Sequence, residues 1–258
     1  MLGLTKSDQN WRWAACGKHP SVKDFFSIGL EFQLAANFSD WIKRGYPALA
    51  ERRASVQGLC SWRFWARGAQ KNDLVCGLLR DSYDSLGRPY PLLIIGTGPL
   101  PSWEDQWDIL PLVCEKTWRQ TEYFSTNKFG DLKTLENEIL KTRPPFPEWP
   151  EPQNISDKLA ELTTMPETST PILSQLNNQT VNESLNDVGN IVIDSEGAYD
   201  SFTLILYINS ILKNRLQASP NAIFIGGTFD KSYLVFFRRP MKSADFMTLW
   251  SPHSTQNK

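Results

Sequence analysis

Histidine and paired cysteine are scarce in this sequence. Its 258 residues include 2 histidines, and because we expect His253 to lie in a frayed terminal segment, any histidine-dependent mechanism must use His19. Its 4 cysteines are widely separated and form no CxxC pair: Cys16, Cys60, Cys76 and Cys114. This spacing argues against a zinc site and against a compact disulfide framework. We therefore expect no bound metal, and we expect the thiols to be free and buried.

An excess of charge and long apolar runs are missing as well. The 27 basic and 28 acidic residues nearly cancel, leaving a net charge of −1, which gives no field to attract nucleic acid or an anionic membrane. The most apolar stretches, PLLIIG and FTLILYI, are far shorter than the ~18 residues that cross a bilayer. The first residues, MLGLTKSDQNWRW, contain no apolar core of a secretory signal. We expect a cytoplasmic protein that binds no nucleic acid and does not insert into a membrane.

Aromatic residues are abundant, and they mark the secondary structure. The chain is 41% hydrophobic and 12% aromatic, with 10 tryptophans, which is typical of a folded protein. Alternating or continuous apolar runs predict strands at 11–16, 60–66, 74–80, 91–96, 190–194, 221–227 and 232–239. Helical spacing of apolar residues predicts helices at 30–44, 101–124, 131–140 and 199–217, and another from residue 243.

Several helix boundaries can be read from single residues. Gly45 and Pro47 should end the helix at 30–44. Ser102 can cap the helix at 101–124, and Pro111 should kink that helix or split it in two. Ser21, with an acidic residue three positions later, resembles the start of a further helix.

These elements predict an α/β fold in a single domain, residues 1–258. Several strands are joined by connections too short for a crossover helix, so the sheet should be mixed and largely antiparallel, with helices on both faces. Residues 143–188 interrupt the pattern with RPPFPEWPEP and a segment rich in Ser, Thr and Asn. We interpret this stretch as a surface insertion.

The segment AACGKHPS raises two chemical hypotheses. A phosphate-binding P-loop needs a glycine five positions before the Gly-Lys pair and Ser or Thr after the lysine, but Arg12 and His19 occupy those places. The pattern therefore fails twice. Cys16, His19 and Asp24 could form a nucleophile, a base and an orienting acid, although a cysteine at the end of an apolar strand is usually a small buried hydrophobic residue.

The loop DSYDSLGRPYP lies between two apolar runs and predicts the turn of a hairpin. Asp84 can accept hydrogen bonds from nearby amides, and Gly87 can adopt the positive φ that a tight turn requires. Arg88 could pair with Asp81 or with Asp84. No helix start follows Gly87, so no ring of helix amides faces an anion. The loop is either a plain ion-paired turn or a surface that contacts a ligand or partner.

Four segments in this order, GKHPSVKDFF, WIKRG, SWRFWA and DSYDSLGRPYPLLI, resemble the TagF family, also called ImpM, of bacterial type VI secretion systems. The closing strands and last helix, from NAIFIGG to DFMTLW, are similar too. The sequence departs from the family pattern at Lys23, where glycine is usual, at Asp81, where proline is usual, and at Tyr90, where phenylalanine is usual.

The resemblance implies a three-layer α/β/α sandwich and a non-enzymatic, cytoplasmic accessory protein without a cofactor. Relatives of this kind restrain the secretion apparatus after translation by binding its components or regulators, in some systems a forkhead-associated scaffold protein. The alternative is a phosphate- or nucleotide-binding hydrolase that uses Cys16, His19 and Asp24, or the loop from Asp84 to Arg88.

Carried onto this chain, the resemblance implies eight positions of interest. Four could contact a partner: Lys18, Asp24, Asp84 and Arg88. Four could shape the turns: Gly17, Pro20, Ser21 and Gly87. The two loops that carry them could lie close together, joined by an Asp24–Arg88 ion pair, as a structural clasp or as a docking edge.

Overall fold

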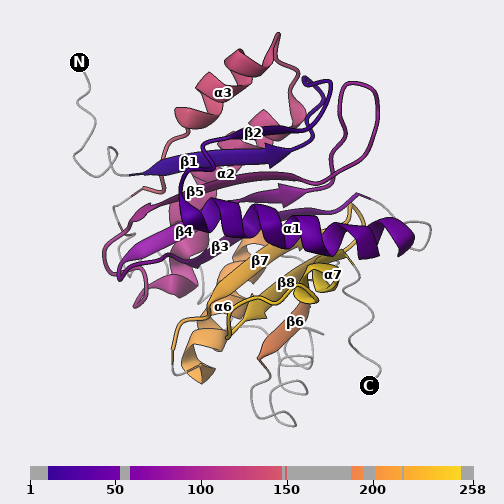
Figure 1. Cartoon of the computed structure of the whole chain (residues 1–258). Coiled ribbons are helices and arrows are strands. Elements are labelled where there is room, and N and C mark those ends of the chain that lie inside the picture. Colours follow the sequence, from indigo (N-terminus) through magenta and orange to yellow (C-terminus); the bar gives the residue numbers. More distant parts are fainter. Residues whose placement is uncertain are drawn as a thin grey trace, which may run out of the picture.

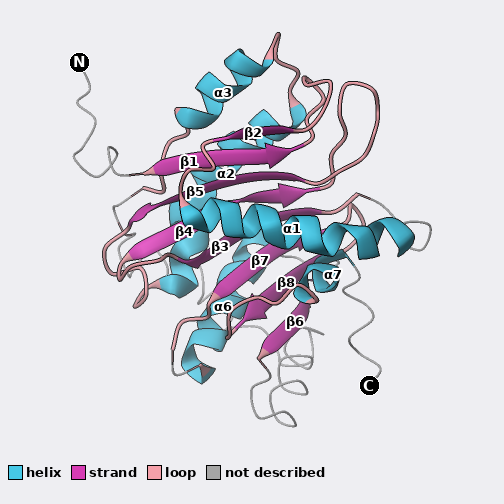
Figure 2. Ribbon diagram, viewed as in Figure 1, coloured by secondary structure: helices cyan, strands magenta, loops and turns pink. Residues whose placement is uncertain are grey.

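Eight strands form one sheet in the computed structural model, which describes residues 11–52, 59–146, 149, 187–193, 201–216 and 218–250 (Figures 1 and 2). The strands are β1 (Arg12–Gly17), β2 (Phe26–Ile28), β3 (Ser61–Arg67), β4 (Asp73–Arg80), β5 (Leu92–Pro99), β6 (Val188–Ile193), β7 (Ala222–Gly227) and β8 (Ser232–Phe237). Their order is β2-β1-β5-β4-β3-β7-β8-β6, and each neighbouring pair is antiparallel. The prediction of a largely antiparallel sheet is confirmed, whereas the parallel pairs of a mixed sheet are absent among the described strands.

Short connections explain most of this topology. The pairs β3–β4, β4–β5 and β7–β8 are joined by loops that can reverse the chain but cannot carry a crossover helix. β1 instead pairs with β5, which comes much later in the chain. The strand β2 was not predicted, because its three residues carry too little alternation to be recognised in the sequence.

Helices cover both faces of the sheet. They are α1 (Gln33–Arg52), α2 (Leu110–Thr126), α3 (Leu132–Leu140), α6 (Ser201–Arg215) and α7 (Asp245–Trp250). The buried side chains of α1 and α7 belong to one hydrophobic cluster, and those of α2, α3 and α6 belong to another. In Figure 1, α1 crosses in front of the strands, and α2 lies behind them.

Alternation along the strands divides the core between these two clusters. In β3, Trp62 and Phe64 face α1, whereas Trp65 faces α2. In β1, Trp13 faces the side of the sheet that α2 and α3 cover, and its neighbour Ala14 faces α1. Because both faces are covered, the central strands can be apolar at nearly every position. The predicted pairing of Trp62 with Phe64 on one face is confirmed.

Two tryptophans, one just before β1 and one within it, lie over glycines of β5. Trp13 is directly opposite Gly96 in the strand register, and a Cβ atom at Gly96 would lie 2.5 Å from the nearest ring atom of Trp13. The same holds for Trp11 and Gly98, where the nearest ring atom would be 2.6 Å away. The two indole rings stack with their centroids 5.9 Å apart. A glycine at these positions leaves room for a flat aromatic ring against the sheet.

The helix predicted at 101–124 begins later than expected. Ser102 adopts a left-handed φ of 65° in a turn and does not cap a helix. A short 3₁₀ segment, η3 (Trp107–Ile109), follows, and α2 then starts at Leu110 with Pro111 in its first turn. Proline is tolerated there because its missing N–H would have no partner within the helix. The predicted kink at Pro111 is therefore a helix start.

The helix α1 continues past its predicted end. Gly45 and Pro47 both lie inside it, and the helix ends at Arg52. A Cβ atom at Gly45 would lie 2.2 Å from Cγ of Phe246, so this glycine allows α7 to pack closely on α1. The indole Nε1 of Trp41 also donates a hydrogen bond to the carbonyl of Lys242, at 2.9 Å. Tertiary packing outweighs local helix propensity here.

Other predicted elements are confirmed with small shifts. The helix α3 is capped by Asp131, whose Oδ1 accepts the N–H of Thr134 at 2.7 Å.

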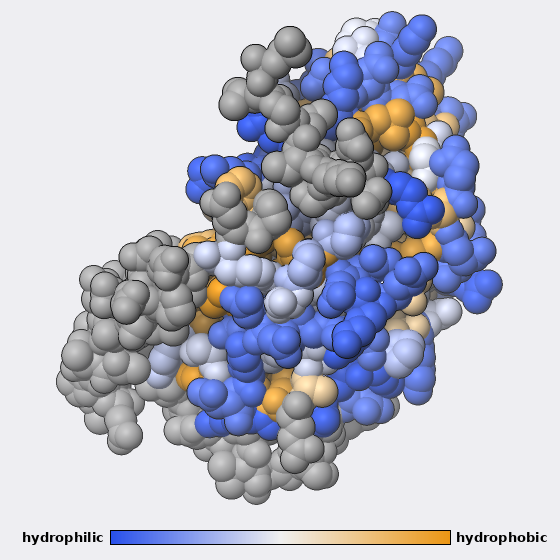
Figure 3. Space-filling view, turned by 90° about the vertical axis from the view of Figure 1, so that its left-hand side faces the viewer, coloured by the Kyte–Doolittle hydropathy of each residue, from blue (hydrophilic) through white to orange (hydrophobic). Residues whose placement is uncertain are grey.

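Most of the predicted insertion at 143–188 lies outside the described residues. In the part of the chain that the structure describes, no helix combines the length and the apolar character needed to cross a bilayer. Hydrophilic residues dominate the side of the molecule seen in Figure 3, where apolar residues form small separate groups.

Candidate functional site

The two loops singled out by the sequence meet at one end of the sheet. Residues 18–25 follow β1, and residues 81–91 join β4 to β5. The N–H of Ser85 donates to the carbonyl of Val22 at 2.9 Å, which ties the loops together. We call the four charged residues at this junction the clasp: Lys18, Asp24, Asp84 and Arg88.

Asp84 is the centre of the clasp and has no exposed surface. Its Oδ2 lies 3.0 Å from Nζ of Lys18 and 2.7 Å from Nε of Arg88. Its Oδ1 accepts the backbone N–H groups of Leu86 and Arg88, each at 3.0 Å. Burial alone would raise the pKa of Asp84, but the backbone and side-chain hydrogen bonds from Arg88, together with Lys18, hold it well below its ordinary value. Asp84 is therefore a fully satisfied buried anion.

Arg88 extends the clasp to the surface. Its Nη2 donates to the carbonyl of Lys23 at 2.7 Å and lies 3.5 Å from Oδ1 of Asp24. The guanidinium is half exposed, and the carboxylate of Asp24 is mostly exposed. The predicted Asp24–Arg88 ion pair is confirmed, although it is the weakest of the three charged contacts. Because it is exposed, it contributes little to stability and is open to solvent.

The predicted turn residues hold the loops in place. Gly17 has φ of 120°, and a Cβ atom there would lie 2.0 Å from the carbonyl oxygen of Pro91. Gly87 has φ of 78° in the turn that follows Asp84. Pro20 lies in a second turn, which is closed by the N–H of Val22 and the carbonyl of His19 at 2.9 Å.

The helix predicted to start at Ser21 is absent. The hydroxyl oxygen of Ser21 accepts the N–H of Phe129 at 2.6 Å and therefore links this loop to the segment after α2. The chain then passes through a bend and enters β2. A local Ser-x-x-Asp pattern could not reveal that the hydroxyl has a distant partner.

The alternative nucleophile set does not assemble. His19 is fully buried; its Nδ1 accepts the N–H of Ser21 at 3.1 Å, and its Nε2 bonds the carbonyl of Phe124 at 2.8 Å. Burial lowers the pKa of His19, which favours the neutral ring. Cys16 belongs to the hydrophobic cluster under α1, and burial raises the pKa of its thiol. Asp24 pairs with Arg88. The ring of His19 therefore bonds backbone groups, Asp24 bonds an arginine, and Cys16 packs in the core.

An aromatic group lies beside the clasp. The ammonium group of Lys18 is 4.7 Å from the ring centroid of Phe25, which is 58% exposed. The rings of Phe25 and Tyr90 meet edge to face at 4.7 Å, and Tyr46 lies 4.5 Å from Tyr90. Burial raises the pKa of Tyr90 to about 12. The clasp therefore presents an ordered surface in which an exposed aromatic ring is combined with paired charges.

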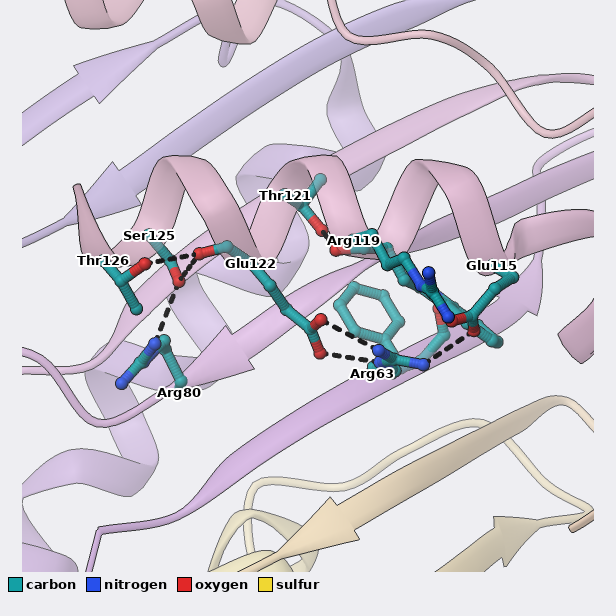
Figure 4. A network of polar contacts seen from close by, with 10 residues as sticks. Arg63, Arg80, Glu115, Arg119, Thr121, Glu122, Ser125 and Thr126 are labelled. Carbon is teal, nitrogen blue, oxygen red and sulfur yellow. Dashed lines mark hydrogen bonds and ion pairs between the residues drawn. The ribbon is translucent and has the colours of Figure 1, made fainter. Parts of the chain in front are cut away.

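Sequence reasoning missed a second charged network, between β3 and α2. Figure 4 shows Arg63 held by two carboxylates: Nε and Nη2 donate to Glu122 at 2.6 and 2.8 Å, and Nη1 donates to Glu115 at 2.8 Å. Burial alone would lower the pKa of Arg63, but Glu122 and Glu115 raise it. The two glutamates are seven residues apart and so lie on one side of the helix, a spacing that could have revealed them.

The structural role of Asp81 was also not predicted from the sequence. It does not pair with Arg88; its Oδ2 accepts the N–H of Cys60 at 3.0 Å, and its Oδ1 accepts the indole N–H of Trp250 at 3.1 Å. This buried carboxylate therefore joins the start of β3 to the end of α7. Nothing in the local sequence indicates these partners, because one is 21 residues away and the other 169.

Comparisons with known proteins agree with the family resemblance of the sequence and with the fold. Residues 14–138 match a family model described as "TagF N-terminal domain, Type VI secretion system-associated". The fold is similar to that of the crystal structure of PA0076 from Pseudomonas aeruginosa PAO1, with a TM-score of 0.51 and 15% sequence identity over 92% of this chain and 93% of that one. At this identity, the similarity concerns the fold alone. No curated protein matches the sequence.

Proposed function

Since residues 14–138 belong to the TagF N-terminal domain family, which is type VI secretion system-associated, we propose that this protein is a non-enzymatic regulator that restrains the secretion apparatus by binding one of its proteins. The observation that carries the proposal is the position of the clasp. All of its residues, from Lys18 to Arg88, lie within the matched segment, and its outer pair, Asp24 and Arg88, is exposed to solvent.

The chemistry of the clasp favours binding. An exposed aromatic ring beside partly exposed, pre-ordered charges is the composition found at protein interfaces. The groups that could serve an acyl- or phosphoryl-transfer reaction are otherwise engaged: both ring nitrogens of His19 bond backbone atoms, and burial raises the pKa of the Cys16 thiol. These contacts support a role without turnover.

The remaining expectations complete the proposal. We expect the protein to act in the cytoplasm on a component or regulator of the apparatus, with a forkhead-associated scaffold protein as the first candidate. We also expect a single domain whose helices and sheet form three layers; the two hydrophobic clusters on opposite faces of the sheet support this arrangement.

Co-purification from cells that carry the apparatus tests the proposal. Wild-type protein should recover a type VI component, and Asp24→Ala and Arg88→Ala should each reduce the recovery. Matched controls are Asp105→Ala and Arg119→Ala, which remove an exposed acid and an exposed base away from the clasp. The controls should recover as much partner as the wild type does.

Thermal unfolding of each variant separates binding from folding. Loss of the partner in a variant that still unfolds at the wild-type temperature makes the clasp a docking site. If the wild-type protein recovers no type VI component, the proposal is wrong. If nucleotides or phosphate esters raise the unfolding temperature specifically, the hydrolase alternative gains support instead.

A further inference from the structure

A cavity of about 450 Å³ lies next to the clasp, between the end of β1, β2 and α1. We call it the β1–α1 pocket, and its main lining residues are Cys16, Phe25, Phe26, Ser39, Lys43 and Tyr90. It is partly open to solvent and mainly apolar. Its volume lies in the range of small binding pockets and would hold a single large side chain with adjoining backbone.

The outer wall of the pocket is fixed in advance. Phe25 and Tyr90 contact each other edge to face, and Tyr46 braces Tyr90 from α1. The hydroxyl of Tyr46 donates to the carbonyl of Pro89 at 3.0 Å, and Lys18 lies against the ring of Phe25. An aromatic wall that is already ordered loses little conformational entropy when a partner binds.

The charge of the pocket has one sign. Its lining includes Lys43 and no acidic residue. Lys43 has an exposed contact with Asp40 at 3.3 Å, which is a weak pair in water and can be exchanged for another carboxylate. Asp84, the nearest buried acid of the clasp, is already enclosed by Lys18 and Arg88. The rim therefore complements a negative group.

We propose that the β1–α1 pocket receives one large apolar side chain from a protein partner, in a segment that places a carboxylate beside that side chain. The apolar group would pack between Phe25, Ile42 and Tyr90, and the carboxylate would meet Lys43. Anchoring one side chain in a pocket beside a polar rim is a common way to concentrate binding energy. This inference rests on the proposed function and names the chemistry of the partner.

A small probe tests the pocket directly. We would titrate 3-phenylpropionate into the protein and follow backbone amide shifts, with the neutral amide 3-phenylpropionamide as the comparison. The largest shifts should fall on lining residues such as Ser27, Ser39 and Lys43, with the millimolar affinity usual for a fragment. Lys43→Glu should weaken binding of the acid by about fivefold or more, whereas Arg44→Glu, the same charge reversal one residue away, should change it by less than about twofold.

The probe also defines what would overturn the inference. Absence of shifts at the lining, equal binding of the neutral amide, or equal weakening by the two charge reversals would each do so. Ser39→Leu, which places a larger side chain in the cavity, should abolish the shifts while the protein still unfolds cooperatively. Retained binding in that variant would also contradict the proposal.

Partner recovery from cells separates this inference from the proposed function. Ser39→Leu and Lys43→Glu should lose the type VI component that the wild type recovers, and Arg44→Glu should keep it. If all three variants keep it, the pocket is not the contact, although the regulatory function stands. If the wild type recovers no such component, the proposed function itself fails.

Discussion

The packing of Trp13 over Gly96 leads to a prediction whose sign depends on a neighbour. Gly96→Ala would normally stabilise a strand by about 0.5–1 kcal/mol, because alanine restricts the unfolded chain more than glycine does. Here the new Cβ atom would lie 2.5–2.6 Å from three atoms of the Trp13 ring. That ring is buried and stacked on Trp11, so it has little room to move. Overpacking of this kind costs about 1–3 kcal/mol.

We therefore expect Gly96→Ala to destabilise the wild-type protein by about 1–2 kcal/mol. Trp13→Leu removes the ring atoms that cause the clash and should itself cost about 3 kcal/mol. In that background, Gly96→Ala should become neutral or stabilising by about 0.5 kcal/mol, which gives a coupling of about 2 kcal/mol between the two sites.

Urea unfolding followed by circular dichroism measures these free energies and the slope m. Gly130→Ala is the control, because no atom lies within 4 Å of a Cβ placed there, and its effect should stay within about 0.5 kcal/mol of zero. An equal cost of Gly96→Ala with and without Trp13, or a stabilising effect in the wild type, would refute the steric explanation.

Three further predictions follow from the buried polar contacts. The pKa of Asp84 is lower in the folded protein than in the unfolded chain. The contribution of Asp84 to stability is therefore complete above the ordinary aspartate pKa and is lost as the pH falls through the folded pKa. Unfolding temperatures measured from pH 5 to pH 2 should fall less steeply in Asp84→Asn than in the wild type. Arg63→Lys keeps the charge but loses the bidentate hydrogen bonding to Glu122. Urea unfolding should show a free energy of unfolding lower by about 1–2 kcal/mol. Asp81→Ala leaves the N–H of Cys60 and the indole N–H of Trp250 without their carboxylate acceptor. The free energy of unfolding should fall by about 2–4 kcal/mol in the same assay. A loss below about 0.5 kcal/mol would mean that water replaces the carboxylate.

Elements with strong periodicity could be predicted, and those decided by distant packing could not. The strand at Trp62 and Phe64 and the helix at Leu204 and Ile208 follow from residue spacing alone. The continuation of α1 through Gly45 depends on Phe246, 201 residues further on, which no local pattern contains. Helix boundaries set by tertiary contacts are therefore the main source of error.

The candidate site shows the same division. The turn chemistry of Asp84 and Gly87 is local, and the sequence predicts it correctly. The meeting of the two loops was expected only from the family resemblance. The leading role of Lys18 beside Asp84 was not anticipated, since their proximity depends on β1 pairing with β5. The β1–α1 pocket was missed because strand β2, which forms part of its wall, was not recognised.

The enclosure of Asp84 by Lys18 and Arg88 also separates two responses to dissolved salt. Mobile ions cannot enter a contact from which solvent is excluded, so raising the ionic strength should leave the inner ion pair of Lys18 and Asp84 nearly intact. The outer pair of Asp24 and Arg88, and any contact that a partner makes with it, is exposed to those ions. If a partner binds at this outer pair, a concentrated salt wash should release it while the loops keep their shape.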